Sequence, residues 1–313
     1  MHNTPLAKTL ATLTLAPEIR IDNLIMFPLV GDARAESEPS YLTLDDSLAA
    51  GWTVVTEVSE QGRVPELKVV NRGPKPTLII DGEELLGAKQ NRVVNLTILV
   101  AAKSKLTIPV SCVEAGRWNM RSRAFSSSPR TQYASGRAKR MQQVTHSILA
   151  SGARVSDQSE VWADIAEKSQ RMRTTSPTSA MEAIFSDHAD VMDKFVSGCH
   201  PIERQVGALF AIGDRVAGFE LFDSAVTCRK LLPKIVRSYA IDAIESQFER
   251  LAVPEPQHLR AAADQFLAAL AASGSASAPA LGLGTDVRLT GSDLIGGALV
   301  FNETVVHATA FTG

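Results

Sequence analysis

The segment DGEELLGAKQNR, residues 81–92, concentrates chemically useful side chains between two strongly apolar runs. Three carboxylates come first, and a Lys-Gln-Asn-Arg run follows them. Carboxylates can act as general bases or bind hard cations, whereas arginine, lysine and amide groups can hold a phosphate or a base edge. A binding site is therefore predicted at this segment, although its residues do not define a reaction.

The two glutamates of this segment are expected to diverge. Asp81-Gly82 is a frequent signal for a two-residue type I′ turn in a β-hairpin. In the register of such a hairpin, Glu83 and Glu84 point to opposite faces. This geometry argues against a paired-carboxylate mechanism built from these two residues alone.

A second strand pair is predicted from RVVNLTILV (92–100) and LTIPVSCVE (106–114), because only one register brings all their apolar residues together. That register places Arg92 opposite Glu114 at the open end of the core, with Cys112 one step deeper. The charged pair is either a structural ion pair that closes the core or part of a ligand site. The Cys112 thiol is interpreted as a small core group, or as a nucleophile with a pKa lowered by Arg92 if it is accessible.

A basic stretch follows this strand pair. Residues 117–140 carry seven arginine or lysine side chains and no acidic one, so they should attract anions. Three alternatives remain open: a solvated loop followed by a helix with one charged face, a site for a phosphate-bearing small molecule, or a nucleic-acid site. Aromatic residues are sparse there, which argues against nucleic acid.

The candidate site combines both segments. Glu114 and Glu83 are the candidate general bases. No histidine lies between His2 and His146 and the three cysteines are far apart, so no His or Cys metal site is predicted, and a hard divalent cation would need carboxylates such as Asp81. The residues expected to contact the ligand are Lys89, Gln90, Asn91, Arg92, Cys112, Arg117 and Trp118.

Composition limits the class of protein. The chain has 313 residues, 45% of them hydrophobic, which is enough for one large domain or two ordinary ones. A formal net charge of −2 argues against a surface that binds nucleic acid throughout. No apolar run approaches the roughly 20 residues of a membrane span. The few separated cysteines favour a reducing cytoplasm.

The hydrophobic periodicity predicts the elements that must position the site. Residues 1–18 form an N-terminal helix or tail, 19–131 a β-rich core, 132–200 a helical insertion, and 201–313 hairpins and helices that complete the core. The expected fold is α+β, with an antiparallel β-sandwich or barrel-like core. The small residues of 273–284 predict a flexible connection.

The motifs DGEELLGAKQNRVVNLTILV and IPVSCVEAGRW, with the later SPTSAM, QVGALFAI and SYAIDA, resemble the ARG-and-rhodanese-phosphatase-superfamily-associated (ARPP) domain family. The resemblance runs from about Ile19 to the C-terminus. It implies a prokaryotic protein linked to conflict or nucleotide-processing systems, whose family neighbours include ADP-ribosylglycohydrolases and phosphatase-like proteins. It therefore implies a nucleotide or ADP-ribose-like ligand, without an established reaction or a catalytic residue to transfer.

Together, the residues and the resemblance predict a protein that binds, and as an enzyme would hydrolyse or otherwise process, a small phosphorylated nucleotide or ADP-ribose-like ligand. Arg92 and Arg117 would hold phosphate, Gln90 and Asn91 would contact hydroxyls or a base edge, and Glu114 would serve as general base. The alternatives are a non-catalytic ligand sensor and a homo-oligomeric scaffold. Exposed apolar stripes on the predicted C-terminal helices would favour the scaffold.

Overall fold

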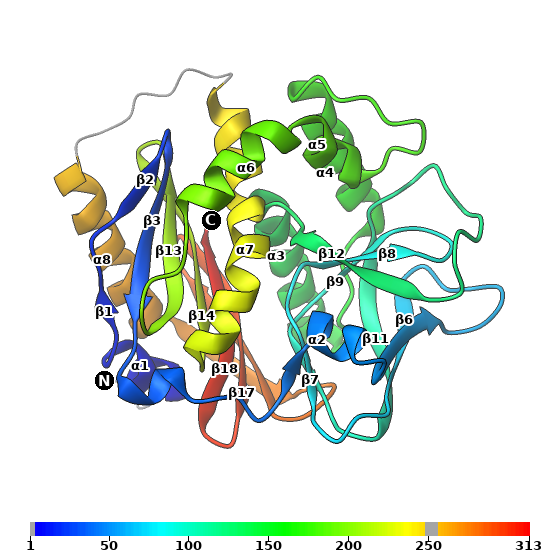
Figure 1. The fold of residues 1–313 in the computed structure, drawn as a ribbon, viewed down its shortest axis with the longest axis horizontal. Helices are drawn as coiled ribbons and strands as arrows, with labels where there is room; N and C mark the ends of the chain where they lie inside the picture. Colours follow the sequence, from blue (N-terminus) through cyan, green and yellow to red (C-terminus); the bar gives the residue numbers. More distant parts are fainter. Residues whose placement is uncertain (1–3, 248–255) are drawn as a thin grey trace.

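The computed structural model describes residues 4–247 and 256–313, and it arranges them as two β structures separated by a long helix (Figure 1). The larger structure is a nine-stranded antiparallel sheet with the order β1-β3-β13-β14-β18-β17-β16-β15, in which β2 also pairs with β3. N-terminal and C-terminal strands therefore share one sheet. Its strands are β1 (Thr14–Leu15), β2 (Ile19–Ile21), β3 (Leu24–Val30), β13 (Gln205–Ile212), β14 (Arg215–Phe222), β15 (Gly274–Pro279), β16 (Thr285–Gly291), β17 (Leu294–Phe301) and β18 (Thr304–Thr312).

The second β structure is a closed barrel with the strand order β11-β6-β5-β12-β8-β9. A small sheet, β10-β7-β4, accompanies it. The α+β fold with a barrel-like β core is thus confirmed. The barrel strands are β5 (Thr53–Glu57), β6 (Glu66–Asn71), β8 (Glu83–Gly87), β9 (Arg92–Val94), β11 (Ser104–Cys112) and β12 (Phe125–Thr131), and the small sheet contains β4 (Leu42–Thr43), β7 (Thr77–Ile79) and β10 (Ile98–Val100).

Helices cover both faces of the large sheet. Alternating apolar residues on each strand give the sheet two buried faces, which pack against α1 (Pro5–Leu10) and α8 (Pro256–Ala272) on one side and α7 (Ala225–Gln247) on the other. Helix α7 also contacts β12, so it lies between sheet and barrel (Figure 1). The remaining helices are α2 (Leu44–Ala49), α3 (Ala134–Ser151), α4 (Gln158–Arg171), α5 (Met181–Asp187) and α6 (Ala189–Gly198).

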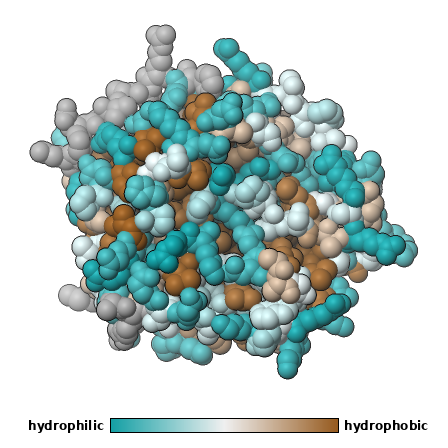
Figure 2. All heavy atoms as spheres, viewed as in Figure 1, coloured by the Kyte–Doolittle hydropathy of each residue, from teal (hydrophilic) through white to brown (hydrophobic). Residues whose placement is uncertain are grey.

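The apolar stripes of α7 and α8 are covered within the chain. Ile235 and Tyr239 of α7, and Leu259 and Phe266 of α8, are all buried. Leu251, expected to end the first stripe, lies outside the described residues. On the face seen in Figure 2, hydrophobic atoms form small groups among hydrophilic ones. The described helices therefore supply no exposed apolar stripe for a scaffold, and none of them is long and apolar enough to cross a membrane.

The predicted hairpin at Asp81-Gly82 is wrong. The turn exists, because the Glu83 N–H donates to the Ile80 carbonyl at 3.2 Å, but only Gly82 has a positive φ, at 77°. Positive φ at the second central residue alone is the pattern of a type II turn, not type I′. The flanking strands then separate, since β7 pairs with β10 and β4, whereas β8 pairs with β9 and β12.

The predicted pairing of residues 92–100 with 106–114 is also wrong in register. Cys112, not Glu114, lies opposite Arg92. The chain leaves the barrel after β9, and β10 pairs with β7 in the small sheet instead. The register differs by two residues, so Arg92 and Cys112 still share one face. A further correction concerns residues 273–284, where β15 forms an edge strand paired with β16 in place of a flexible connection.

Stability should fall as pH rises through the titration of Asp223. This carboxylate, which follows β14, accepts a hydrogen bond from the Tyr41 hydroxyl, and burial raises its pKa to about 6 from 3.8. The folded-state pKa lies above the unfolded value, so the protonated carboxyl group stabilises the folded state. This contribution to the free energy of unfolding is complete below about pH 4 and is lost by about pH 6. The loss should be on the order of 2–3 kcal/mol.

Urea unfolding of Asp223→Asn between pH 4 and 7 measures this effect. The variant should show a flatter profile than the unmodified protein, whereas Asp293→Asn, at an exposed position, should keep the original slope. Parallel profiles for the unmodified protein and Asp223→Asn would refute the assignment.

Candidate functional site

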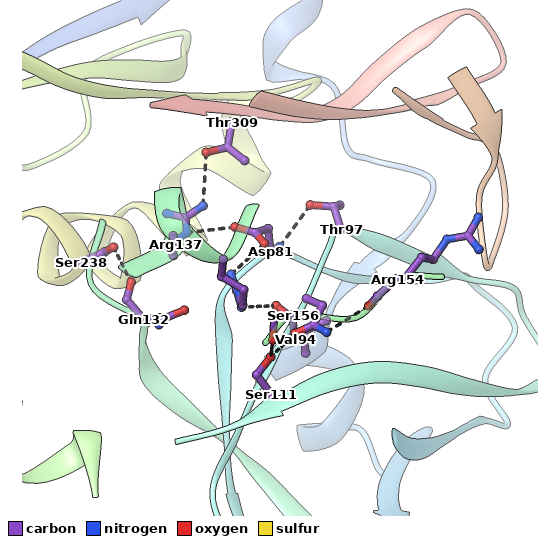
Figure 3. Close-up of polar contacts among 12 residues, drawn as sticks. Asp81, Val94, Thr97, Ser111, Gln132, Arg137, Arg154, Ser156, Ser238 and Thr309 are labelled. Atoms are coloured by element: carbon purple, nitrogen blue, oxygen red, sulfur yellow. Dashed lines mark hydrogen bonds and ion pairs between the residues drawn. The ribbon is translucent and has the colours of Figure 1, made fainter. Parts of the chain in front are cut away.

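Asp81 is held by two arginines from one face of α3. Arg137 Nε donates to its Oδ2 at 3.1 Å, and Arg140 Nη2 donates to its Oδ1 at 2.8 Å. Arg137 and Arg140 are three residues apart, so a helix presents them on the same side. The Asp81 N–H also donates to Thr97 Oγ1 at 3.1 Å (Figure 3). Both carboxylate oxygens are thus engaged, and the side chain is 1% exposed.

Arg137 continues from Asp81 to the large sheet. Its Nη1 donates to Glu220 Oε1 on β14 at 2.7 Å, and His307 Nε2 on β18 lies 3.3 Å from Glu220 Oε2. His307 Nδ1 in turn lies 2.7 Å from Thr97 Oγ1. The contacts therefore close on themselves. We call this set the buried ring, and its members are Asp81, Thr97, Arg137, Glu220 and His307.

Electrostatics favours the charged forms of Arg137 and Glu220 in the buried ring. Burial opposes both charges, but Glu220 and Asp81 together hold the pKa of Arg137 above its ordinary value. For Glu220, burial would raise the pKa, and Arg137 and His307 outweigh it, so the pKa is lowered. The pKa of Arg140 is lowered because burial outweighs the attraction of Asp81.

Gly82 allows Arg137 to reach Asp81. A Cβ atom at this position would lie 2.8 Å from Arg137 Cδ and Nε, in a backbone conformation with positive φ. The Gly82 carbonyl accepts a hydrogen bond from the Gln132 N–H at 2.8 Å. The acidic turn is therefore shaped around an arginine, which explains why the chain departs from a simple hairpin there.

Glu83 and Glu84 bind cations from two further segments. Glu83 Oε1 lies 2.7 Å from Lys234 Nζ on α7, and Lys234 also pairs with Asp45 of α2. Glu84 Oε2 accepts a hydrogen bond from Arg130 Nε of β12 at 2.7 Å, although burial still raises the pKa of Glu84. The three acidic residues thus bind separate partners. They fasten the turn to α3, α7 and β12.

The predicted ligand residues gather at one end of the barrel, where β8 and β11 end and β9 and β12 begin. Arg92 lies inside this end, Glu114 and Arg117 lie just beyond β11, and Trp118 is at the surface. Glu83 and Asp81 are not part of this group, because they belong to the contacts described above. We call the group the barrel-mouth cluster: Lys89, Gln90, Asn91, Arg92, Cys112, Glu114, Arg117 and Trp118.

Glu114 is engaged in internal contacts within the cluster. Its carboxylate lies 2.6 Å from Arg117 Nη2 and accepts hydrogen bonds from the Asn91 N–H and Thr178 Oγ1. Burial raises the pKa of Glu114, but these donors, Arg117 first, bring it below the ordinary value. A carboxylate with such partners joins three loops, and a role for Glu114 as general base stays a prediction.

Cys112 lies in the core of the barrel end and has no access to solvent. The residue is fully buried opposite Arg92, and burial raises the pKa of its thiol despite the nearby guanidinium. A lowered pKa was expected only for an accessible thiol, and here desolvation of the buried thiol outweighs the lowering effect of Arg92. Cys112 contributes to packing at the barrel end.

Arg92 retains an unpaired donor. Its Nε donates to the Val64 carbonyl at 3.2 Å, whereas Nη2 is buried and has no hydrogen-bond partner among the described residues. The Trp118 ring lies above it, 5.8 Å from Arg92 Cζ and 5.2 Å from Lys89 Nζ. Trp118 itself is 47% exposed. An accessible aromatic ring therefore lies over a buried cation.

The buried ring was not predicted from the sequence. Its members are far apart, with Arg137 56 residues from Asp81 and 83 from Glu220. The sequence did contain an indication of buried polar contacts, since Glu220 and His307 interrupt apolar runs of predicted strands. A polar side chain buried in such a strand needs a hydrogen-bond partner. Both carboxylate oxygens of Asp81, the candidate cation ligand, accept hydrogen bonds from arginines. No group of three or more potential metal-binding side chains occurs in residues 4–247 and 256–313.

Replacing Asp81 by Asn should destabilise the fold strongly. The change leaves Arg137 and Arg140 buried with less compensating charge, and breaking such a pair costs about 3–5 kcal/mol. Asp214→Asn, at an exposed side chain near Arg215, is the matched control and should have little effect. Urea unfolding of both variants measures the difference, and equal stabilities would contradict this role for Asp81.

Comparison with known proteins places these features in a family. No curated protein and no solved structure matches the chain. The model of the ARG and Rhodanese-Phosphatase-superfamily-associated Protein domain, ARPP-1, matches residues 12–311. The match includes both the buried ring and the barrel-mouth cluster. It spans nearly the whole chain, which therefore belongs to the ARPP-1 family.

Proposed function

We propose that the barrel mouth binds a small phosphorylated nucleotide or ADP-ribose-like ligand. The observation that carries this proposal is the unpaired, buried Nη2 of Arg92 beneath the half-exposed ring of Trp118. A buried charged donor without a partner costs stability, so a ligand that supplies an acceptor there gains affinity.

The chemistry around Arg92 fits the parts of such a ligand. The Trp118 ring can stack on a nucleobase, and Lys89 beside it can pair with a phosphate. Glu57 Oε2 and Gln90 Oε1 are buried acceptors without partners among the described residues, and they would receive ribose hydroxyls or base N–H groups. Aromatic, cationic and acceptor groups thus occur together at one barrel end.

The Trp118 ring covers Arg92, so binding requires this ring to shift. Arg92 is fully buried, whereas the loop that carries Trp118 is largely exposed from residue 118 to 123. A ligand that inserts between the ring and the guanidinium would bury both partners. This arrangement supports ligand binding at the end of a barrel, where small-molecule sites are frequent.

The state of Glu114 favours a binding or sensor role over turnover. A general base needs a lone pair within reach of the proton that it removes. The Glu114 carboxylate already accepts three donors, and its pKa lies below the ordinary value. We therefore propose a ligand sensor first. Hydrolysis is the second candidate, and it would require Glu114 to release Arg117.

Ligand binding can be tested at the exposed Trp118 and the half-buried Lys89, outside the buried ring. Isothermal titration with ADP-ribose, NAD and AMP should identify a ligand for the unmodified protein. Trp118→Ala should then weaken binding about fivefold or more, because base stacking on an aromatic side chain contributes about 1–3 kcal/mol. Lys89→Ala should weaken the binding of the phosphorylated ligands and leave the binding of adenosine unchanged.

Met120→Ala is the matched control, since Met120 is 53% exposed in the same loop. It should leave the affinity unchanged, and all three variants should keep the melting temperature of the unmodified protein. The proposal fails if none of the ligands binds, or if Met120→Ala weakens binding as much as Trp118→Ala does.

A further inference from the structure

A groove separate from the barrel mouth lies between α3 and α4. It has a volume of about 760 Å³. Its wall includes Gln132 and Arg140, together with side chains from both helices. Arg140 connects this groove to the buried ring through its contact with Asp81.

Two buried polar atoms on the groove wall have no partner among the described residues. They are Gln132 Oε1, an acceptor, and Arg140 Nε, a donor. The backbone of Gln132 is satisfied, because its N–H donates to Gly82 and its carbonyl accepts from Ser238 Oγ at 2.6 Å. Figure 3 shows the side-chain amide directed away from the Ser238 contact. Both residues are 1% exposed, so water competes poorly for them.

The charge of the groove disfavours an anion. Its wall carries four carboxylates, Asp157, Glu160, Asp164 and Glu167, against two cationic side chains with His146 aside. One of those cations, Lys139, is already paired with Asp164. The groove is therefore net negative at neutral pH, and a phosphate would meet repulsion there.

The two unpaired atoms and the wall charge select a ligand class. Gln132 Oε1 needs a donor and Arg140 Nε needs an acceptor, and a hydroxyl group can serve in either role. The carboxylates of Glu160 and Glu167 favour an ammonium group at the outer wall. We propose that the groove between α3 and α4 is a second ligand site, which takes a small amine rich in hydroxyl groups, of the amino-sugar class.

Glucosamine, glucose and glucose 6-phosphate are suitable probes. Titration calorimetry on the full chain should give the tightest binding for glucosamine, weaker binding for glucose, and the weakest for glucose 6-phosphate. Glu160→Gln should weaken the binding of glucosamine at least about threefold and leave the affinity for glucose unchanged, because only the ammonium group interacts with the Glu160 charge. Tightest binding of the phosphate, or binding of none of the probes, would overturn the proposal.

Gln132→Met tests the buried acceptor in two ways. Removal of an unpaired buried oxygen should raise the melting temperature of the free protein, and the variant should lose the glucosamine response. Gln170→Met is the matched control, because Gln170 is exposed on α4 and does not line the groove. It should change neither quantity. A lower melting temperature for Gln132→Met with glucosamine binding retained would mean that Gln132 is structural only.

The two sites can be told apart by cross-testing. Trp118→Ala should leave glucosamine binding intact, and Gln132→Met should leave ADP-ribose binding intact. Loss of both ligands in either variant would contradict two independent sites.

Discussion

The guanidinium of Arg137 joins two buried carboxylates that belong to different β structures. Asp81 lies at the turn between the small sheet and the barrel, and Glu220 lies within the large sheet. A buried carboxylate is costly unless a cation pairs with it, and Arg137 pairs with both of these, each 1% exposed, while Arg140 also binds Asp81. Thr97 and His307 complete the connection on the opposite side. The mutual position of barrel, sheet and α3 therefore depends on a closed set of charge-assisted hydrogen bonds.

This constraint explains the unusual composition of residues 81–92. Asp81, Glu83 and Glu84 each bind a cation from a separate part of the chain, so the density of charge serves assembly. Among the unpaired buried polar atoms, some lie at the barrel mouth and others in the groove between α3 and α4. Rigid surroundings can hold such atoms in place at a cost in stability, which ligand binding would offset.

Hydrophobic periodicity predicted secondary-structure elements, because these depend on the local sequence pattern. Alternating apolar residues predicted strands other than β12 and β15, and helical spacing predicted α3 and α4, because both patterns reflect one-sided burial. The strand pairing at Arg92 was wrong because RVVNLTILV divides at Asn95, whose side chain bonds Arg154 and Ser111 in place of continuing the barrel. No local pattern reports such tertiary partners. The candidate ligand residues were predicted as a group, whereas the ring and the groove depend on contacts between distant segments.

A double-mutant cycle of Asp81→Asn and Glu220→Gln tests the shared role of Arg137 most directly. Urea unfolding of the unmodified protein, the two single variants and the double variant gives the coupling energy. If Arg137 binds both carboxylates as one unit, the double variant should lose less stability than the sum of the single losses, by more than about 1 kcal/mol. Losses that add within about 0.5 kcal/mol would show two independent ion pairs and would contradict a ring that holds barrel and sheet together.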